Sequence, residues 1–234
     1  SSGEWTHRGG NARHLMPHSA LSATPARIWS VGIGSGSSRK NRIAAAPVVS
    51  DGRIFTIDAG TGVRATSTSG ESLWSTDLTA DFDKGGGQSA GGLAVAGDRV
   101  FATTGYGEIV AMEASSGKVI WRQRLDASLS GAPATDGTAV YASGGDGSAW
   151  ALDATDGKVL WQVTGTPGAA AYVGTAAPSV GERAVIFPSA AGELMAVLKI
   201  GGGTKIWQKS LAGKRLGRAY ALTPDVTADA VIHG

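Results

Sequence analysis

The sequence contains no cysteine, and this absence sets the first limits on its chemistry. No disulfide framework, no Cys-ligated metal and no thiol nucleophile can form in the chain. An excess of one charge is missing as well, because 21 Lys and Arg stand against 19 Asp and Glu, for a net charge of +2. The basic residues are scattered along the chain rather than clustered. This distribution argues against a nucleic-acid partner.

Long apolar runs are absent too. The longest, Leu194 to Leu198 with Ile200 beyond it, falls far short of the roughly 20 residues that span a bilayer. The chain begins Ser1-Ser2-Gly3, followed by neither the basic start nor the apolar stretch of a signal peptide. If the native protein is exported, we expect that its leader has been removed.

Glycine is abundant, with 36 residues, whereas Phe and Tyr number 4 each beside 7 Trp. This composition is typical of short strands joined by tight turns. Five Trp recur at intervals of 45, 47, 40 and 46 residues: Trp29, Trp74, Trp121, Trp161 and Trp207. Propeller blades repeat every 40 to 50 residues or so. The spacing predicts an all-β propeller in which these Trp pack between blades.

The copy of the repeat that ends at Trp161 shows the four strand-length segments of one blade. Its turns are expected at Asp136-Gly137, Gly145-Asp146-Gly147 and Asp156-Gly157, because glycine accepts positive φ. Each unit is therefore expected to be one antiparallel sheet of four strands.

We expect a single partial propeller domain over 1–234. Its parts are an N-terminal strand and loop at 1–40, blades at 41–77, 91–124, 131–164 and 175–210, and the start of a further blade at 223–234. The last expected blade stops where a hairpin should turn, and closed propellers need about 4 to 8 complete blades, so the chain is expected to be a fragment of a larger ring. The uncovered faces of its end blades favour a homodimer that imitates the complete propeller, and a curved open arc is the alternative.

The segment Ala151 to Trp161, Ala-Leu-Asp-Ala-Thr-Asp-Gly-Lys-Val-Leu-Trp, resembles the repeat of the pyrroloquinoline-quinone (PQQ) propeller superfamily. Ala111 to Trp121 is a second good copy, whereas Ala196 to Trp207 is one residue longer. Within the superfamily, the opening Trp5 to His14 and the segment Lys214 to Tyr220 resemble the BamB family, lipoproteins of the outer-membrane β-barrel assembly (BAM) machinery. The resemblance implies half of an eight-bladed ring.

The same resemblance implies a non-enzymatic periplasmic scaffold without a cofactor. Its family members are held at the inner leaflet of the outer membrane by a lipid on an N-terminal cysteine, which this chain lacks. Two family loops contact the POTRA domains of the barrel-inserting subunit BamA, and they correspond here to 168–174 and 218–227. The implied partners are BamA, the other BAM subunits and unfolded outer-membrane proteins.

Seven residues in these two loops are the candidate partner-binding residues: Ala170, Tyr172, Val173, Gly174, Arg218, Asp225 and Thr227. Gly174 and Asp225 match the family pattern. Ala170, Tyr172 and Val173 stand where the family has an apolar-apolar-basic run, and Thr227 replaces a second acidic position. Tyr172 is expected to be exposed and to anchor the contact, because loops carry function.

Residues with catalytic potential form no convincing set. His7, His14 and His18 lie among glycine and proline, which argue against the helix that a metal-binding His pair needs. The Gly-rich segment 32–42 precedes an expected strand, whereas a phosphate-binding loop precedes a helix. No nucleophile elbow is present. We therefore expect no metal site and no catalytic residues.

Two other functions stay open. The quinoprotein dehydrogenases of the superfamily bind PQQ and calcium through converging acids and a vicinal disulfide, whereas the acids here are dispersed among turns and cysteine is absent. A PQQ-dependent dehydrogenase or PQQ sensor is one alternative. A generic periplasmic interaction propeller is the other, since the fold alone does not determine the function.

Overall fold

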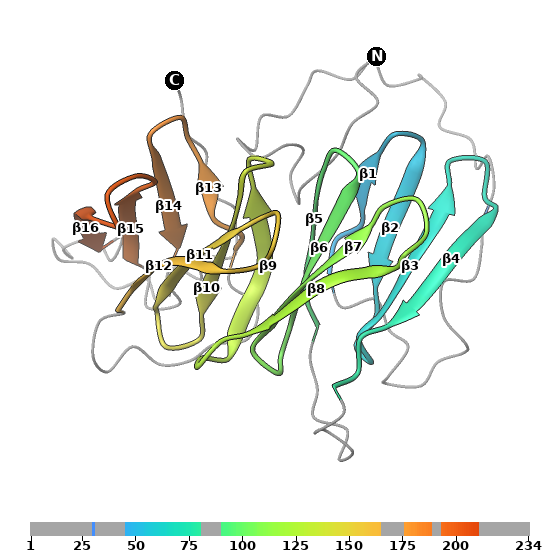
Figure 1. The fold of residues 1–234 in the computed structure, drawn as a ribbon, viewed down its shortest axis with the longest axis horizontal. Coiled ribbons are helices and arrows are strands. Elements are labelled where there is room, and N and C mark those ends of the chain that lie inside the picture. The colour runs from blue at the N-terminus through green and yellow to red at the C-terminus, as the bar shows by residue number, and fades with distance from the viewer. Residues whose placement is uncertain (1–29, 31–44, 81–89, 165–175, 189–192, 211–234) are drawn as a thin grey trace, which may run out of the picture.

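The computed structural model describes residues 30, 45–80, 90–164, 176–188 and 193–210. These residues form sixteen strands in four antiparallel sheets, with no helix among them. The strands of each sheet follow chain order, so each connection within a sheet is a hairpin. Figure 1 shows the sheets one after another in chain order, as the blades of a propeller. The expected all-β propeller of four-stranded blades is thereby confirmed.

The strands have the following bounds. Blade 1 contains β1 (Val48–Ser50), β2 (Arg53–Ile57), β3 (Gly62–Ser67) and β4 (Ser72–Asp77). Blade 2 contains β5 (Ala90–Ala96), β6 (Arg99–Thr104), β7 (Glu108–Glu113) and β8 (Val119–Arg124). Blade 3 contains β9 (Leu129–Thr135), β10 (Ala139–Gly144), β11 (Ala149–Asp153) and β12 (Val159–Val163). Blade 4 contains β13 (Ser179–Val180), β14 (Ala184–Pro188), β15 (Glu193–Leu198) and β16 (Lys205–Ser210).

Several expected features lie outside the described residues. They are the N-terminal strand and loop at 1–40 with Trp29, and the start of a further blade at 223–234. In the part of the chain that the structure describes, no segment qualifies as a membrane-crossing helix.

The strands are short because turn residues interrupt the chain at regular points. In blade 1 the turn between β1 and β2 has positive φ at both Asp51 (48°) and Gly52 (69°), as a two-residue type I′ hairpin requires. Blade 3 lies between blades 2 and 4, and all six residues of its middle strand β10 are buried. In the outermost strand β12, by contrast, only Trp161 is buried.

The outermost strand of every blade carries a β-bulge at the same position. In blade 3, Ala151 pairs with Trp161 while the next residue, Leu152, pairs with Val159, so that Leu160 is left over. The same shift leaves one aliphatic residue over in each of the other blades: Leu73, Ile120 and Ile206. All four are 39 to 51% exposed. The bulge therefore explains why large apolar side chains recur on the outer edge.

The Trp that follows the bulge packs against the next blade in blades 1, 2 and 3. Trp121 of β8 donates a hydrogen bond from its indole Nε1 to the carbonyl oxygen of Ala154, at 3.1 Å. Its ring covers Gly157, where an added Cβ would come within 2.5 Å of the ring. Trp74 bonds to the Ala114 carbonyl in the same way, at 2.9 Å. Each indole thus links two sheets by one hydrogen bond and a close ring contact.

Candidate functional site: a groove between the third and fourth blades

The loops expected to bind a partner are not among the described residues. The segment 168–174 lies between β12 and β13, and 218–227 follows β16. All seven candidate contact residues fall in these two segments, so they stay predictions. Of the repeat Trp, the structure describes the side chains of Trp74, Trp121 and Trp161, and it places Trp207 on β16.

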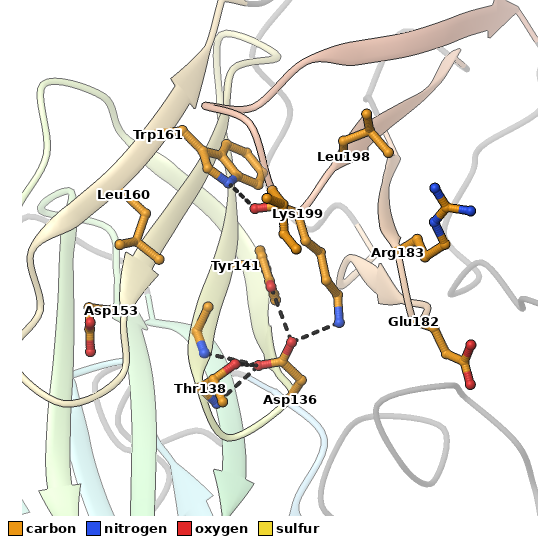
Figure 2. Close-up of a pocket in the computed structure, with 12 residues that line it drawn as sticks. Asp136, Thr138, Tyr141, Asp153, Leu160, Trp161, Glu182, Arg183, Leu198 and Lys199 are labelled. Carbon is orange, nitrogen blue, oxygen red and sulfur yellow. Dashed lines mark hydrogen bonds and ion pairs between the residues drawn. The ribbon is translucent and has the colours of Figure 1, made fainter.

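A groove of about 730 Å³ lies where blade 3 meets blade 4 (Figure 2). Blade 3 contributes the turn between β9 and β10, the start of β10, the end of β11 and the bulge of β12. Blade 4 contributes the turn between β13 and β14 and the turn after β15. The lining residues are Asp136, Thr138, Ala139, Tyr141, Asp153, Leu160, Trp161, Glu182, Arg183, Leu198, Lys199 and Ile200.

The carboxylate of Asp136 is held in place by its own turn. Its Oδ1 accepts hydrogen bonds from the backbone N–H of Thr138 at 3.0 Å, from the Thr138 hydroxyl at 2.8 Å and from the backbone N–H of Ala139 at 2.9 Å. Gly137 has a φ of 90°, which allows the chain to turn back so tightly. The other carboxylate oxygen, Oδ2, therefore points in a defined direction into the groove.

That second oxygen connects the two blades. Lys199, in the turn after β15, forms an ion pair from Nζ to Asp136 Oδ2 at 2.7 Å. The hydroxyl of Tyr141 donates to the same oxygen at 3.2 Å, and Lys199 Nζ lies 5.9 Å from the centroid of the Tyr141 ring. Figure 2 shows the Tyr141 and Lys199 side chains meeting at the Asp136 carboxylate.

The charge states of this cluster follow from its contacts. Burial alone would raise the pKa of Asp136, but hydrogen bonds from Lys199, Ala139 and Thr138 outweigh it and hold that pKa well below its ordinary value of 3.8. Burial raises the pKa of Tyr141 above its ordinary value of 10.0, and the negative charge of Asp136 and the hydrogen bond to it raise it further. Asp136 is therefore ionised and Tyr141 protonated at neutral pH.

The other described blade junctions lack this cluster. The carbonyls that accept the indole hydrogen bonds belong to Ala114, Ala154 and Lys199, so these three positions are structurally equivalent. Of these three residues, only Lys199 has a charged side chain. Between blades 2 and 3 the contact is made differently, by Arg99, whose Nη1 donates to the carbonyls of Ala154 at 2.5 Å and Thr155 at 3.1 Å.

The aromatic partner of the Trp changes at the same junction. Phe55 packs on Trp74 with centroids 5.9 Å apart, and Phe101 on Trp121 with centroids 6.0 Å apart. Tyr141 keeps this arrangement with Trp161, at 6.1 Å, and adds the hydroxyl that reaches Asp136. The repeat therefore gains a polar group here without losing its packing.

Sequence reasoning did not find this groove. Two signals were present: the closing segment of blade 4 is one residue longer than the two good copies, and Lys199 occupies a position that is Ala in those copies. Chemically, the groove suits binding more than catalysis, because a carboxylate as acidic as Asp136 is a poor proton acceptor. Among the described residues, no three His, Asp or Glu come together to hold a metal ion.

Comparison with known structures identifies the architecture. BamB from Moraxella catarrhalis is 19% identical, with a TM-score of 0.57 over 71% of this chain and 48% of that one. Quinohemoprotein alcohol dehydrogenase from Comamonas testosteroni is 18% identical, with a TM-score of 0.67 over 89% of this chain and 41% of that one. A europium-containing methanol dehydrogenase is 17% identical, with a TM-score of 0.65 over 89% of this chain and 49% of that one.

This chain spans less than half the length of each of those three proteins. Similarity at such low identity shows the fold alone, which scaffolds and dehydrogenases share. No curated protein matches the chain in sequence. The sequence profile of one family, described as outer membrane protein assembly factor BamB, matches residues 59–234, which is most of the chain. The chain therefore belongs to the BamB family of PQQ-repeat propellers.

Proposed function

We propose that the chain acts as a non-enzymatic scaffold of the BAM machinery at the periplasmic face of the outer membrane. The observation that carries this proposal is the family match over 59–234. The stacked blades support it, since a propeller of this kind presents rigid rims of loops suited to holding partners. In the full-length protein, a lipid would hold the scaffold at the membrane.

The proposed partners are the POTRA domains of BamA, bound through 168–174 and 218–227, with other BAM subunits and unfolded outer-membrane proteins as further partners. Both segments follow the last strand of a blade. The corresponding connection between blades 2 and 3 lies beside the turn at Gly105-Tyr106, and together they line an open, shallow hollow of about 400 Å³. Connections of this type can therefore form recesses that a partner side chain could enter.

Calorimetric titration of the full-length protein with the matching POTRA array tests the proposal. Tyr172→Ala should weaken binding by more than about 1 kcal/mol while leaving the melting temperature nearly unchanged. Ile120→Ser, on the outer edge of blade 2, is the control and should bind normally. Absence of binding at high micromolar concentration would refute the scaffold role.

The likeness to a quinohemoprotein alcohol dehydrogenase keeps an alternative open, namely a PQQ-dependent enzyme or sensor. Incubation of the full-length protein with PQQ and Ca²⁺ distinguishes the two functions. A bound quinone spectrum together with dye reduction by alcohols would establish the enzyme, whereas a quinone spectrum without turnover would indicate a sensor.

A further inference from the structure

The junction between blades 3 and 4 departs from the other described junctions in a coordinated way. In blades 2, 3 and 4, the residue whose carbonyl accepts the indole hydrogen bond is followed by the glycine that lies under the same Trp ring. The glycine comes three residues later in blade 2 (Ala114 to Gly117) but four residues later in blade 4 (Lys199 to Gly203). The extra length is taken up by glycines, because 201, 202 and 203 all have positive φ. We propose that this groove binds an extended polypeptide segment in which a large apolar side chain stands beside lysine or arginine.

The apolar walls of the groove are open to solvent. Leu160, the bulge residue of β12, is 51% exposed, and Ile200, in the lengthened turn of blade 4, is 88% exposed. Leu198 and Trp161 are the other large apolar residues that line the groove. Removing exposed apolar surface from water is favourable, so Leu160 and Ile200 supply the driving force for docking an apolar side chain.

The charge of the groove favours a basic residue next to the apolar side chain of the bound polypeptide. Three carboxylates, Asp136, Asp153 and Glu182, face two cations, Lys199 and Arg183, which leaves one net negative charge. In Figure 2 the three carboxylates lie along one side of the groove, opposite the apolar wall. Lys199 already pairs with Asp136, so the net negative charge of the lining is carried by the remaining three charged residues, Asp153, Glu182 and Arg183, taken together.

The shape of the groove favours a polypeptide over a small molecule. Sites for small molecules enclose most of the ligand surface. This groove is instead bordered by exposed residues on the blade 4 side, because Glu182, Arg183 and Ile200 all face solvent. A chain can cross such an opening and place one side chain inside. The inference rests on this geometry and does not depend on the proposed scaffold role.

Fluorescence polarisation with labelled peptides tests the proposal on the whole chain. The probe is Gly-Ser-Lys-Phe-Lys-Ser-Gly, compared with the same peptide carrying Glu in place of both Lys, and with Ser in place of Phe. We expect the Lys-Phe-Lys peptide to bind at least about tenfold more tightly than either comparison peptide, and salt to weaken it. Leu160→Ser and Ile200→Ser should each lower its affinity about fivefold.

Two controls distinguish binding in the groove from nonspecific binding elsewhere on the protein. Ile120→Ser removes the equivalent bulge residue between blades 2 and 3, and it should leave the affinity unchanged. The double variant Asp153→Asn, Glu182→Gln should remove most of the preference for Lys over Glu. Equal binding of the Lys and Glu peptides, an equal loss in Ile120→Ser, or no binding at all would overturn the proposal. Tryptamine binding as tightly as the peptide would overturn it in favour of a small organic cation.

Discussion

Asp136 shows how one residue can join two blades. Its carboxylate takes three hydrogen bonds from its own turn and meets the Lys199 ammonium and the Tyr141 hydroxyl across the groove. The two partners in the ion pair keep only 16% and 22% of their side chains exposed. Because the pair is partly shielded from water, it is worth more than a surface ion pair, although solvent still screens it.

Asp136→Asn keeps the shape of the side chain and removes its charge. We expect it to lower the free energy of unfolding at neutral pH by about 1 to 2 kcal/mol. The folded pKa of Asp136 lies below the unfolded value of 3.8, so its contribution is complete above that pH. As the pH falls below about 3.8, the unfolded state binds a proton first and the contribution is progressively lost.

Urea denaturation over a pH series measures this effect. The difference between the native chain and Asp136→Asn should shrink as the pH falls below about 3.8. Asp51→Asn is the matched control, because Asp51 occupies the corresponding turn of blade 1 with 81% of its side chain exposed, and it should change little at any pH. A difference of constant size across the series would contradict the assignment of the charge to this ion pair.

A second residue-scale prediction concerns glycine under the Trp rings. Gly157 has a φ of 77°, and an added Cβ would lie 2.5 Å from the Trp121 ring. Gly97 has a similar φ of 56° with nothing within 4 Å of the added Cβ. Gly97→Ala should therefore cost only the backbone strain, about 1 kcal/mol. Gly157→Ala should cost about 2 kcal/mol more, because the ring must shift.

Thermal and denaturant unfolding of these two glycine variants provide the measurement. The two substitutions add the same methyl group in a similar backbone conformation, so their difference isolates the contact with the ring. Equal losses would show that the ring moves aside freely, and that the close approach of glycine and indole contributes little to the junction.

At the scale of the element, the outermost strand carries two neighbouring large side chains with different roles. In β8, the bulge leaves Ile120 at 39% exposure, whereas Trp121, the next residue, is buried at 9%. The register shift between Ala111 and Met112 separates the two roles. An exposed aliphatic residue therefore precedes the buried Trp121 and the buried Trp161, and hydrophobicity alone does not distinguish the two kinds of position.

Trp121→Ala should lower the free energy of unfolding by about 3 to 5 kcal/mol, because it empties a buried aromatic site. Trp121→Phe retains a ring beside Gly157 but loses the hydrogen bond to the Ala154 carbonyl, and it should cost less. Ile120→Ala, one residue earlier, should change stability by no more than about 0.5 kcal/mol. Guanidinium denaturation followed by circular dichroism measures all three. A reversed order of the Trp and Ile effects would contradict the bulge register.

At the scale of the whole molecule, the blades are coupled through their neighbours. Blades 2 and 3 approach most closely at the inner strands, where a Cβ added to Gly92 of β5 would lie 2.5 Å from the Cβ of Ala132 of β9. The hydroxyl of Thr103 in β6 also donates to the carbonyl of Gly131, at 2.7 Å. In such an arrangement, the stability of each blade depends on its own sheet and on the two junctions beside it.

Hydrogen exchange should reveal this coupling. Trp161→Ala removes the indole that joins blade 3 to Lys199 of blade 4. We expect amides of β14 and β15 to lose protection, whereas amides of β2 and β3 in blade 1, two blades from Trp161, keep it. Mass-spectrometric exchange with peptide resolution measures the difference. Uniform loss of protection in all four blades would show instead that the propeller opens as one cooperative unit.

The sequence by itself determined the blade and its repeat. Turn signals such as Asp136-Gly137 act locally, since a hairpin joins residues that are neighbours along the chain, and the interval between Trp residues reports the length of one sheet. The motif at Ala151 to Trp161 led directly to the superfamily. These features could be predicted because each depends on contacts within a single blade.

Only the tertiary structure decided what the blade junctions do. Asp136 and Lys199 are 63 positions apart, and nothing in either segment indicates that stacking brings their charges to 2.7 Å. The exposure of Leu160 depends on a bulge whose register is set by pairing with β11, and a hydrophobic pattern favours burial instead. The longer closing segment of blade 4 and Lys199 mark this blade as different in the sequence, but they do not reveal a groove, because its walls belong to two sheets whose separation is set by packing between blades.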